Sequence, residues 1–316
     1  MLTDSSKYLR CAKKNAKECF YNLKAMSCVN CRLTTTNFTS SSVLFPKLSA
    51  LNLSSNPFTS FDFRETPGSV STLQISHVQL KESSVTEVLS LLPKSIKKLN
   101  ISYSGLDFEW SMLKNGWPNM DMLDLSGLVP RAAISERRLG EGAVAAQKPL
   151  SSICDHAAGK SIKELHVSNC SLAGELPDFT NCEHLEVLDM SQNLFSTLRL
   201  DKFPPGLRGL NLRGNNFSNV LNVSQLPQRL LSLDLSKNRL HGTISTASLP
   251  PQISYFDISH NAFSGTLNLT ELPETARFVY LQYNNFTGEA ELSDIPLGIR
   301  FIMIHHNNWD CRMPAP

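Results

Sequence analysis

Asparagine recurs at a fixed interval of 23 residues through the last third of the chain. The series consists of Asn215, Asn238, Asn261, Asn284 and Asn307. A proline series keeps the same interval, at Pro204, Pro227, Pro250, Pro273 and Pro296. A fixed period of this length predicts a solenoid, in which each repeat forms one coil stacked on the next. Stacked coils present a broad surface, which favours binding of another molecule over catalysis.

The apolar residues around each Asn follow a pattern that predicts a short strand. One copy of the pattern consists of Leu230, Leu233, Leu235, Asn238 and Leu240. Its second and third apolar positions alternate with polar ones, which is typical of a strand with one buried face. Each strand is expected to pair in parallel with its copy in the next repeat, while the coil returns behind the sheet.

The Asn position predicts a ladder of buried amides. A sharp turn after the strand leaves backbone groups unpaired, and an amide can both donate and accept hydrogen bonds. Cys can partly replace it because Cys is small and readily buried. The predicted ladder residues are Cys31, Asn56, Cys170, Asn193, Asn215, Asn238, Asn261, Asn284 and Asn307. Val78, Ser104 and Leu128 fall in the same frame without the amide, which brings the prediction to about twelve repeats.

With this pattern the chain resembles the leucine-rich repeat proteins over roughly residues 23–311. A Gly after the ladder, as at Gly242 and Gly265, is similar to the plant-receptor subtype. Leu-Pro pairs such as Leu226-Pro227, together with the segment Asn307-Asn308-Trp309-Asp310-Cys311, look most like kinetoplastid surface-antigen proteins. The resemblance implies a β-dominated α/β repeat solenoid, curved like a horseshoe with its strands on the concave face.

Residues 1–24 are expected to cap the first coil, and residues 25–316 to form the solenoid. The first segment carries six Lys or Arg residues without an apolar stretch, so it does not read as a signal peptide. An insertion at about residues 129–148 is either a partner-contacting arm or a solvated loop.

The chain has no run of 18 apolar residues, so no membrane span is expected. Its net charge of +2 gives no electrostatic case for nucleic acid.

Four of the eight cysteines crowd the N-terminal region, namely Cys11, Cys19, Cys28 and Cys31. A disulfide-stapled cap with three possible pairings is one interpretation. The other is buried thiols, because Cys31 falls on the ladder and Cys28 on a strand position; a zinc site is less favoured. Cys170 and Cys182 are expected to be buried thiols. Five sequons are candidate glycosylation sites if the protein is secreted, at Asn37, Asn52, Asn100, Asn222 and Asn268.

An aromatic cluster in the C-terminal third is the candidate partner-binding site. We expect its members to face outward from strands on consecutive levels, as a binding hot spot would. They are Tyr255, Phe278, Tyr280, Tyr283, Phe301, Met303, His305 and His306. The rival interpretation is that these aromatics only pack on each other. His305 and His306 are adjacent, and successive strand residues point apart, so they are poor joint ligands for a metal.

The sequence favours a non-catalytic recognition module without a cofactor. It contains no phosphate-binding Gly loop and no hydrolase or metalloprotease motif. The Asp column that includes Asp234 and Asp257 is expected to face solvent, with no cause for shifted pKa values. The resemblance implies a surface or secreted protein that binds a protein or glycan. Alternatives are an intracellular scaffold or regulator, and a fragment of a larger receptor.

Overall fold

The computed structural model describes residues 22–33, 45–80, 84–108, 120–129, 154 and 161–310. The chain divides into two compact units, residues 1–142 with 156–162 and residues 143–155 with 163–316. Several predicted features lie outside the described residues, namely the cap before residue 22, Asn37, the insertion beyond residue 129, Cys11, Cys19 and Cys311.

Parallel strands of three residues each form the sheet of the first unit. In the described part of this unit they are β1 (Ala25–Ser27), β2 (Ala50–Asn52), β3 (Thr72–Gln74), β4 (Lys98–Asn100) and β5 (Met122–Asp124). Each strand pairs with the strand of the next repeat without a register shift, so that Leu51 lies opposite Leu73 and Leu73 opposite Leu99. The coils return through short helices, η2 (Phe63–Glu65) and α4 (Val85–Leu91).

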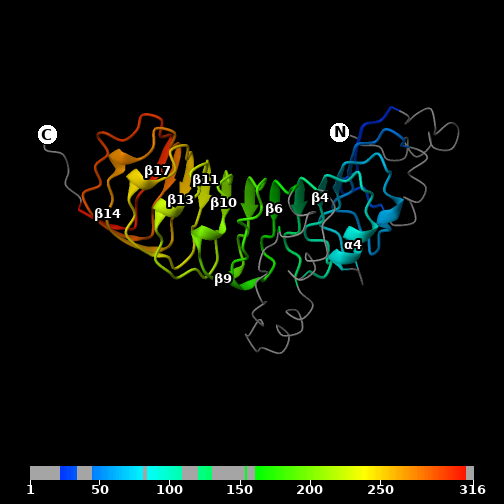
Figure 1. Ribbon diagram of the computed structural model, residues 1–316, viewed down its shortest axis with the longest axis horizontal. Helices are drawn as coiled ribbons and strands as arrows, with labels where there is room; N and C mark the ends of the chain where they lie inside the picture. The colour runs from blue at the N-terminus through cyan, green and yellow to red at the C-terminus, as the bar shows by residue number, and fades with distance from the viewer. Residues whose placement is uncertain are drawn as a thin grey trace. The chain divides into compact units, whose positions relative to one another are not determined.

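The second unit repeats this arrangement with closer regularity (Figure 1). Its parallel strands are β6 (Glu164–His166), β8 (Val187–Asp189), β10 (Gly209–Asn211), β11 (Ser232–Asp234), β13 (Tyr255–Asp257), β15 (Phe278–Tyr280) and β17 (Phe301–Met303). Two further rows of short strands lie after the turns: β7 (Ala173–Glu175) with β9 (Leu194–Thr197), and β12 (His241–Gly242), β14 (Ala262–Thr266), β16 (Asn285–Gly288) and β18 (Asn308–Trp309). The coils return through 3-10 turns, η5 (Leu200–Lys202), η6 (Val223–Gln225), η7 (Thr246–Ser248) and η8 (Leu269–Glu271). This is the β-dominated parallel-strand solenoid that the repeat period predicts.

Columns of equivalent apolar residues fill the core of each unit. The middle residue of most strands is buried, as with Leu210 and Leu233, while the first and third residues are more exposed. A column of phenylalanines lies behind the ladder, and the rings of Phe195 and Phe217 stack with centroids 6.5 Å apart. Full burial of one such side chain contributes roughly 1.5–3 kcal/mol. Because the register is constant, the outward-facing residues also form columns.

The Asn side chains join each coil to the coil before it. The Asn193 Oδ1 accepts hydrogen bonds from the backbone N–H groups of Cys170 (3.1 Å) and Leu172 (3.0 Å). Its Nδ2 donates to the carbonyl oxygens of Val167 (2.8 Å) and Met190 (3.0 Å). One amide therefore satisfies backbone groups on two levels that would otherwise be buried without partners.

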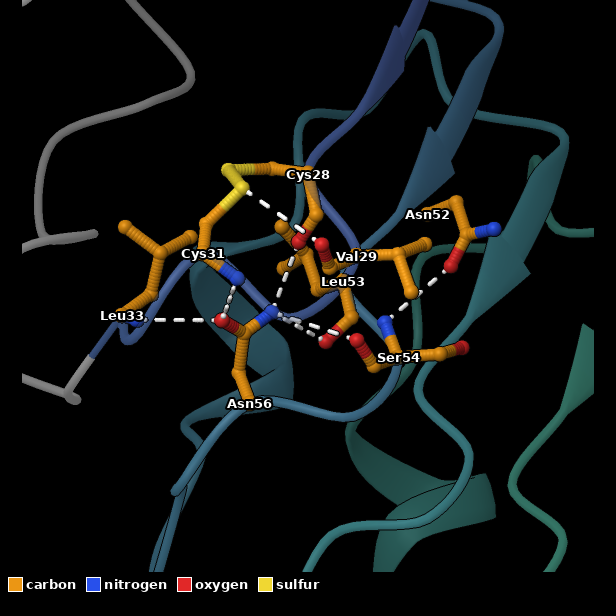
Figure 2. The surroundings of a disulfide bond; sticks show 8 residues. All are labelled: Cys28, Val29, Cys31, Leu33, Asn52, Leu53, Ser54 and Asn56. Atoms are coloured by element: carbon orange, nitrogen blue, oxygen red, sulfur yellow. Dashed lines mark hydrogen bonds between the residues drawn. A yellow bond between two sulfur atoms is a disulfide. The ribbon is translucent and has the colours of Figure 1, made fainter. Parts of the chain in front are cut away.

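Figure 2 shows the same arrangement at Asn56 in the first unit. The Asn56 Oδ1 accepts from the backbone N–H groups of Cys31 (2.9 Å) and Leu33 (3.0 Å), and its Nδ2 donates to the Cys28 carbonyl (2.7 Å). The sulfur atoms of Cys28 and Cys31 are joined in a disulfide, with Cα atoms 5.6 Å apart. The interpretation of these two residues as buried thiols is therefore wrong.

A second disulfide joins Cys154 to Cys182, with Cα atoms 5.1 Å apart. The expectation that Cys182 is a buried thiol is wrong, because its sulfur is bonded to that of a cysteine 28 residues earlier. Cys170 keeps a buried thiol, which donates to the Ser168 carbonyl at 3.3 Å. Among the described helices, we find none that is long and apolar enough to cross a lipid bilayer.

Candidate binding face

The first and third residues of the parallel strands form what we call the strand face of the second unit. Along its last four levels the register places Ser232, Tyr255, Phe278 and Phe301 in one column. The neighbouring column consists of Asp234, Asp257, Tyr280 and Met303. Adjacent strands lie about 4.8 Å apart, so side chains within a column contact their neighbours.

Four aromatic residues of this face form what we call the aromatic strip, namely Tyr255, Phe278, Tyr280 and Phe301. The Tyr280 ring lies diagonally between two others, with centroids 5.5 Å from those of Tyr255 and Phe301. The side chains of Phe278 and Phe301 remain 37% and 41% exposed. Exposed aromatic rings in contact across neighbouring strands are typical of a binding surface.

The other predicted aromatic residues lie in the turns and not on strands. Tyr283 follows β15 by three residues and has a positive φ of 58°; His306 likewise has 54°. The expectation that Tyr283, His305 and His306 occupy strands is therefore wrong. The Tyr283 ring, 41% exposed, stacks between those of His260 and His306 at 4.2 Å from each. The Nδ1 atoms of His305 and His306 lie 2.6 Å apart.

These four residues, His260, Tyr283, His305 and His306, form what we call the turn cluster. Their stack arises because one turn residue of each level adopts the same left-handed conformation, which places equivalent side chains above one another. Burial lowers the pKa of His260, and the nearby Lys237 charge acts in the same direction. His260 escaped sequence reasoning, although its spacing of 23 residues from Tyr283 was the signal that could have found it.

Two aspartates beside the aromatic strip are less exposed than predicted. Asp234 and Asp257, which we call the acidic pair, lie opposite each other on β11 and β13. Asp257 is only 5% exposed, and burial raises the pKa of Asp234. The expectation that this column faces solvent is wrong at Asp257, and the expectation of no shifted pKa is wrong at Asp234. Burial, with the acidic pair as a second cause, also raises the pKa of Tyr255.

Hydrogen bonds fix one oxygen of each carboxylate. The Asp234 Oδ1 accepts from the backbone N–H and the hydroxyl of Ser236, at 2.9 and 2.6 Å. The Asp257 Oδ1 accepts from the Ser259 N–H at 2.9 Å, and its Oδ2 lies 3.5 Å from the Tyr255 hydroxyl. The site thus combines rigid carboxylates with aromatic rings.

The described glycosylation candidates all have a structural hydrogen bond. The Asn222 and Asn268 side chains are exposed at the starts of η6 and η8, and each Oδ1 accepts from the sequon Ser or Thr at 2.8 Å. The Oδ1 atoms of Asn52 and Asn100 accept from backbone N–H groups two residues later, at 3.0 Å. The Asn-x-Ser/Thr pattern therefore has a conformational use in this repeat. No group of three or more His, Cys, Asp or Glu side chains suited to a metal occurs in the described parts of the chain.

No family model matches the chain, and no curated protein matches it. Its likeness to solved structures lies in the fold. A leucine-rich repeat protein from Leptospira interrogans matches with a TM-score of 0.62 and 17% identity, over 97% of this chain and 82% of that protein. The solved structures and the repeat geometry define a leucine-rich repeat solenoid.

Two matches are to longer proteins. The ectodomain of the Arabidopsis thaliana receptor kinase GASSHO1/SCHENGEN3, solved in complex with CASPARIAN STRIP INTEGRITY FACTOR 2, has a TM-score of 0.60 and 19% identity. The match covers 83% of this chain and 30% of that ectodomain. YopM from Yersinia enterocolitica has a TM-score of 0.51 and 21% identity, over 90% of this chain and 56% of YopM. The chain spans under two thirds of either protein.

Proposed function

We propose that the protein is a recognition module that binds a protein partner through the strand face of its second unit. The observation that carries the proposal is the aromatic strip, whose rings contact one another diagonally while the side chains of Phe278 and Phe301 remain well exposed. Rigid aromatic side chains contribute large contact areas at low entropic cost, which is why they dominate protein interfaces.

The surroundings of the strip also support binding. The backbone that carries the rings is held by parallel pairing, on both sides for β13 and β15 and on one side, by β15, for β17 in the described sheet. A rigid surface loses little conformational freedom when a partner binds, which favours affinity. The turn cluster lies beside the same levels and extends the aromatic surface, because Tyr283 follows Tyr280 by three residues.

We propose that the protein acts at the cell surface or after secretion. The disulfides Cys28–Cys31 and Cys154–Cys182 support this location, since such bonds persist in oxidising compartments. The exposed sequon residues Asn222 and Asn268 would accept glycans there. The resemblance of the Leu-Pro pairs to those of kinetoplastid surface-antigen proteins supports the same cell-surface or secreted location.

A photo-crosslinking experiment tests the strand face directly. Benzoylphenylalanine is placed at Phe278, or at the exposed Val220 as a control, because Val220 bridges to His241 in the second row of strands. Each protein is irradiated in an extract of the cells that make it, and adducts are identified by mass spectrometry. We expect a polypeptide adduct at Phe278 that is absent at Val220.

Two substitutions complete the test. Tyr280→Ala and Tyr283→Ala should each reduce the adduct at Phe278 without lowering the melting temperature appreciably, since both side chains lie on the surface. Equal adducts at Phe278 and Val220, or an adduct unaffected by both substitutions, would refute the proposal. A carbohydrate adduct would indicate that the strand face binds a glycan and not a protein.

A further inference from the structure

Where the third residue of a strand is Asn or Asp, it has a structural task that does not require charge. Its side-chain oxygen accepts a hydrogen bond from the backbone N–H two residues later. Asn211 does this at 3.1 Å and Asp189 at 2.9 Å, as Asp234 and Asp257 do at 2.9 Å. Asn and Asp are therefore equivalent for the fold at this position, because each offers the same Oδ1 acceptor.

At two levels the chain nevertheless places a carboxylate where burial makes a charge unfavourable. Asp257 is almost fully covered, and the carboxylate of Asp234 lies beside it on the neighbouring strand. Burial of an ionised carboxylate without a counter-charge costs free energy, and two adjacent carboxylates repel each other. An amide would complete the same turn without that cost.

The described residues do not supply a salt-bridge partner for either carboxylate. The guanidinium of Arg213 lies nearby, and its Nη1 donates to the Ser236 hydroxyl at 2.6 Å. That hydroxyl in turn donates to Asp234 Oδ1, so Arg213 is linked to Asp234 through Ser236, and its charge offsets part of the cost of burying that carboxylate. Lys237 and His260 lie in the turns next to the pair.

A third acceptor lies on the same face without a hydrogen-bond partner. Gln282 is 9% exposed, and its Oε1 is buried without a donor in the described structure. Leu281 is buried in the core, so Gln282 and Tyr280 extend on the same side of the strand. A buried acceptor without a donor costs about 1–3 kcal/mol, which a ligand N–H group would recover.

We infer that the acidic pair, Gln282 and the rings of Tyr255 and Tyr280 form a receptor site for a basic side chain of the protein partner. A Lys ammonium carries three donors and no acceptor, which matches the unpartnered Gln282 Oε1 and the remaining acceptor capacity of the two carboxylates. Tyr rings attract a cation through their faces. The inference rests on the proposed function and specifies the chemistry of the partner.

The test uses fluorescently labelled hexalysine with both ends capped, titrated into the full chain at low ionic strength and followed by anisotropy. Asp257→Asn and Asp234→Asn each keep the Oδ1 acceptor and remove one charge. Asp189→Asn is the matched control, because it removes the same charge from the same turn on β8. Tyr280→Leu removes a ring without changing charge.

We expect each substitution in the acidic pair to weaken hexalysine binding about tenfold. The control Asp189→Asn should stay within about twofold, and Tyr280→Leu should weaken binding about fivefold. The inference is overturned if Asp189→Asn has an effect equal to that of Asp257→Asn, which would indicate attraction to net charge alone. It is also overturned if hexalysine fails to bind at about 1 mM.

The Phe278 crosslink separates this inference from the proposed function. If an adduct forms in the wild-type chain and persists in Asp257→Asn, the proposed partner binding stands. The inference that the partner inserts a basic side chain is then refuted. Loss of the adduct in Asp257→Asn, together with weakened hexalysine binding, would support both. Absence of any adduct in the wild type would refute the proposed function itself.

Discussion

Asn261→Ala should destabilise the protein more than the size of the side chain suggests. The Asn261 Oδ1 accepts from the Leu240 N–H at 3.0 Å, and Nδ2 donates to the carbonyls of Leu235 and Ile258 at 3.0 and 3.1 Å. Alanine leaves these groups without the amide. One buried N–H that loses its acceptor costs about 1–3 kcal/mol. The two carbonyl oxygens that lose the amide donor add only about 1 kcal/mol, because a carbonyl oxygen is more easily hydrogen-bonded to water. The expected loss is about 2–4 kcal/mol.

Urea denaturation followed by circular dichroism measures this free energy. Asn261→Asp is an informative second variant, because it keeps the acceptor for Leu240 but turns a carboxylate oxygen toward the carbonyl oxygens of Leu235 and Ile258, so at pH 7 its loss should be at least as large. Asn285→Ala, which replaces an exposed Asn after the next ladder residue, is the control and should change stability by less than about 0.5 kcal/mol. A loss below about 0.5 kcal/mol for Asn261→Ala would refute the account of the ladder.

Two further predictions concern charge and covalent links. Burial raises the folded-state pKa of Asp234 above its ordinary value of 3.8, so the unfolded chain binds fewer protons between the two values and stability falls as the pH rises through that window. Asp234→Asn should therefore stabilise the chain at pH 7, and a gain that persisted unchanged below about pH 3.8 would contradict this cause in urea titrations across pH. Cys154→Ser with Cys182→Ser opens a link between residues 28 apart and should cost about 3–4 kcal/mol. The shorter Cys28–Cys31 link should cost about half as much, and equal losses in thermal melts would argue against an origin in chain entropy.

The repeat period predicts the fold because one interval fixes several structural features together. A constant 23-residue spacing places Asn238 and Asn261 at equivalent positions, and the unshifted register of β11 and β13 follows from it. The strand pattern also indicates which residues face outward, so Tyr255 and Tyr280 could be assigned to one surface. All these features depend on positions within a repeat.

The features that sequence reasoning missed depend on contacts between neighbouring repeats. Asp257 occupies a position that is half-buried on most of the other described strands, and it is buried here beside the large rings of Tyr255 and Tyr280. Tyr283 has the spacing of a strand residue, yet the chain has already turned at that position. The Cys154–Cys182 pairing spans two coils, and the repeat pattern carries no information about such pairing.

The hydrogen bonds of the Asn ladder give the solenoid a direction. Each amide serves the coil that precedes it, as when the Asn307 Oδ1 accepts from Phe286 N–H and its Nδ2 donates to the Leu281 carbonyl. Unfolding of one coil therefore removes the amide that the preceding coil needs. Unfolding of that preceding coil, in contrast, leaves the Asn of the next coil in place. Opening at the level of Asn307 would propagate backward toward β15, so an intact Asn307 level protects the surface that carries Tyr280.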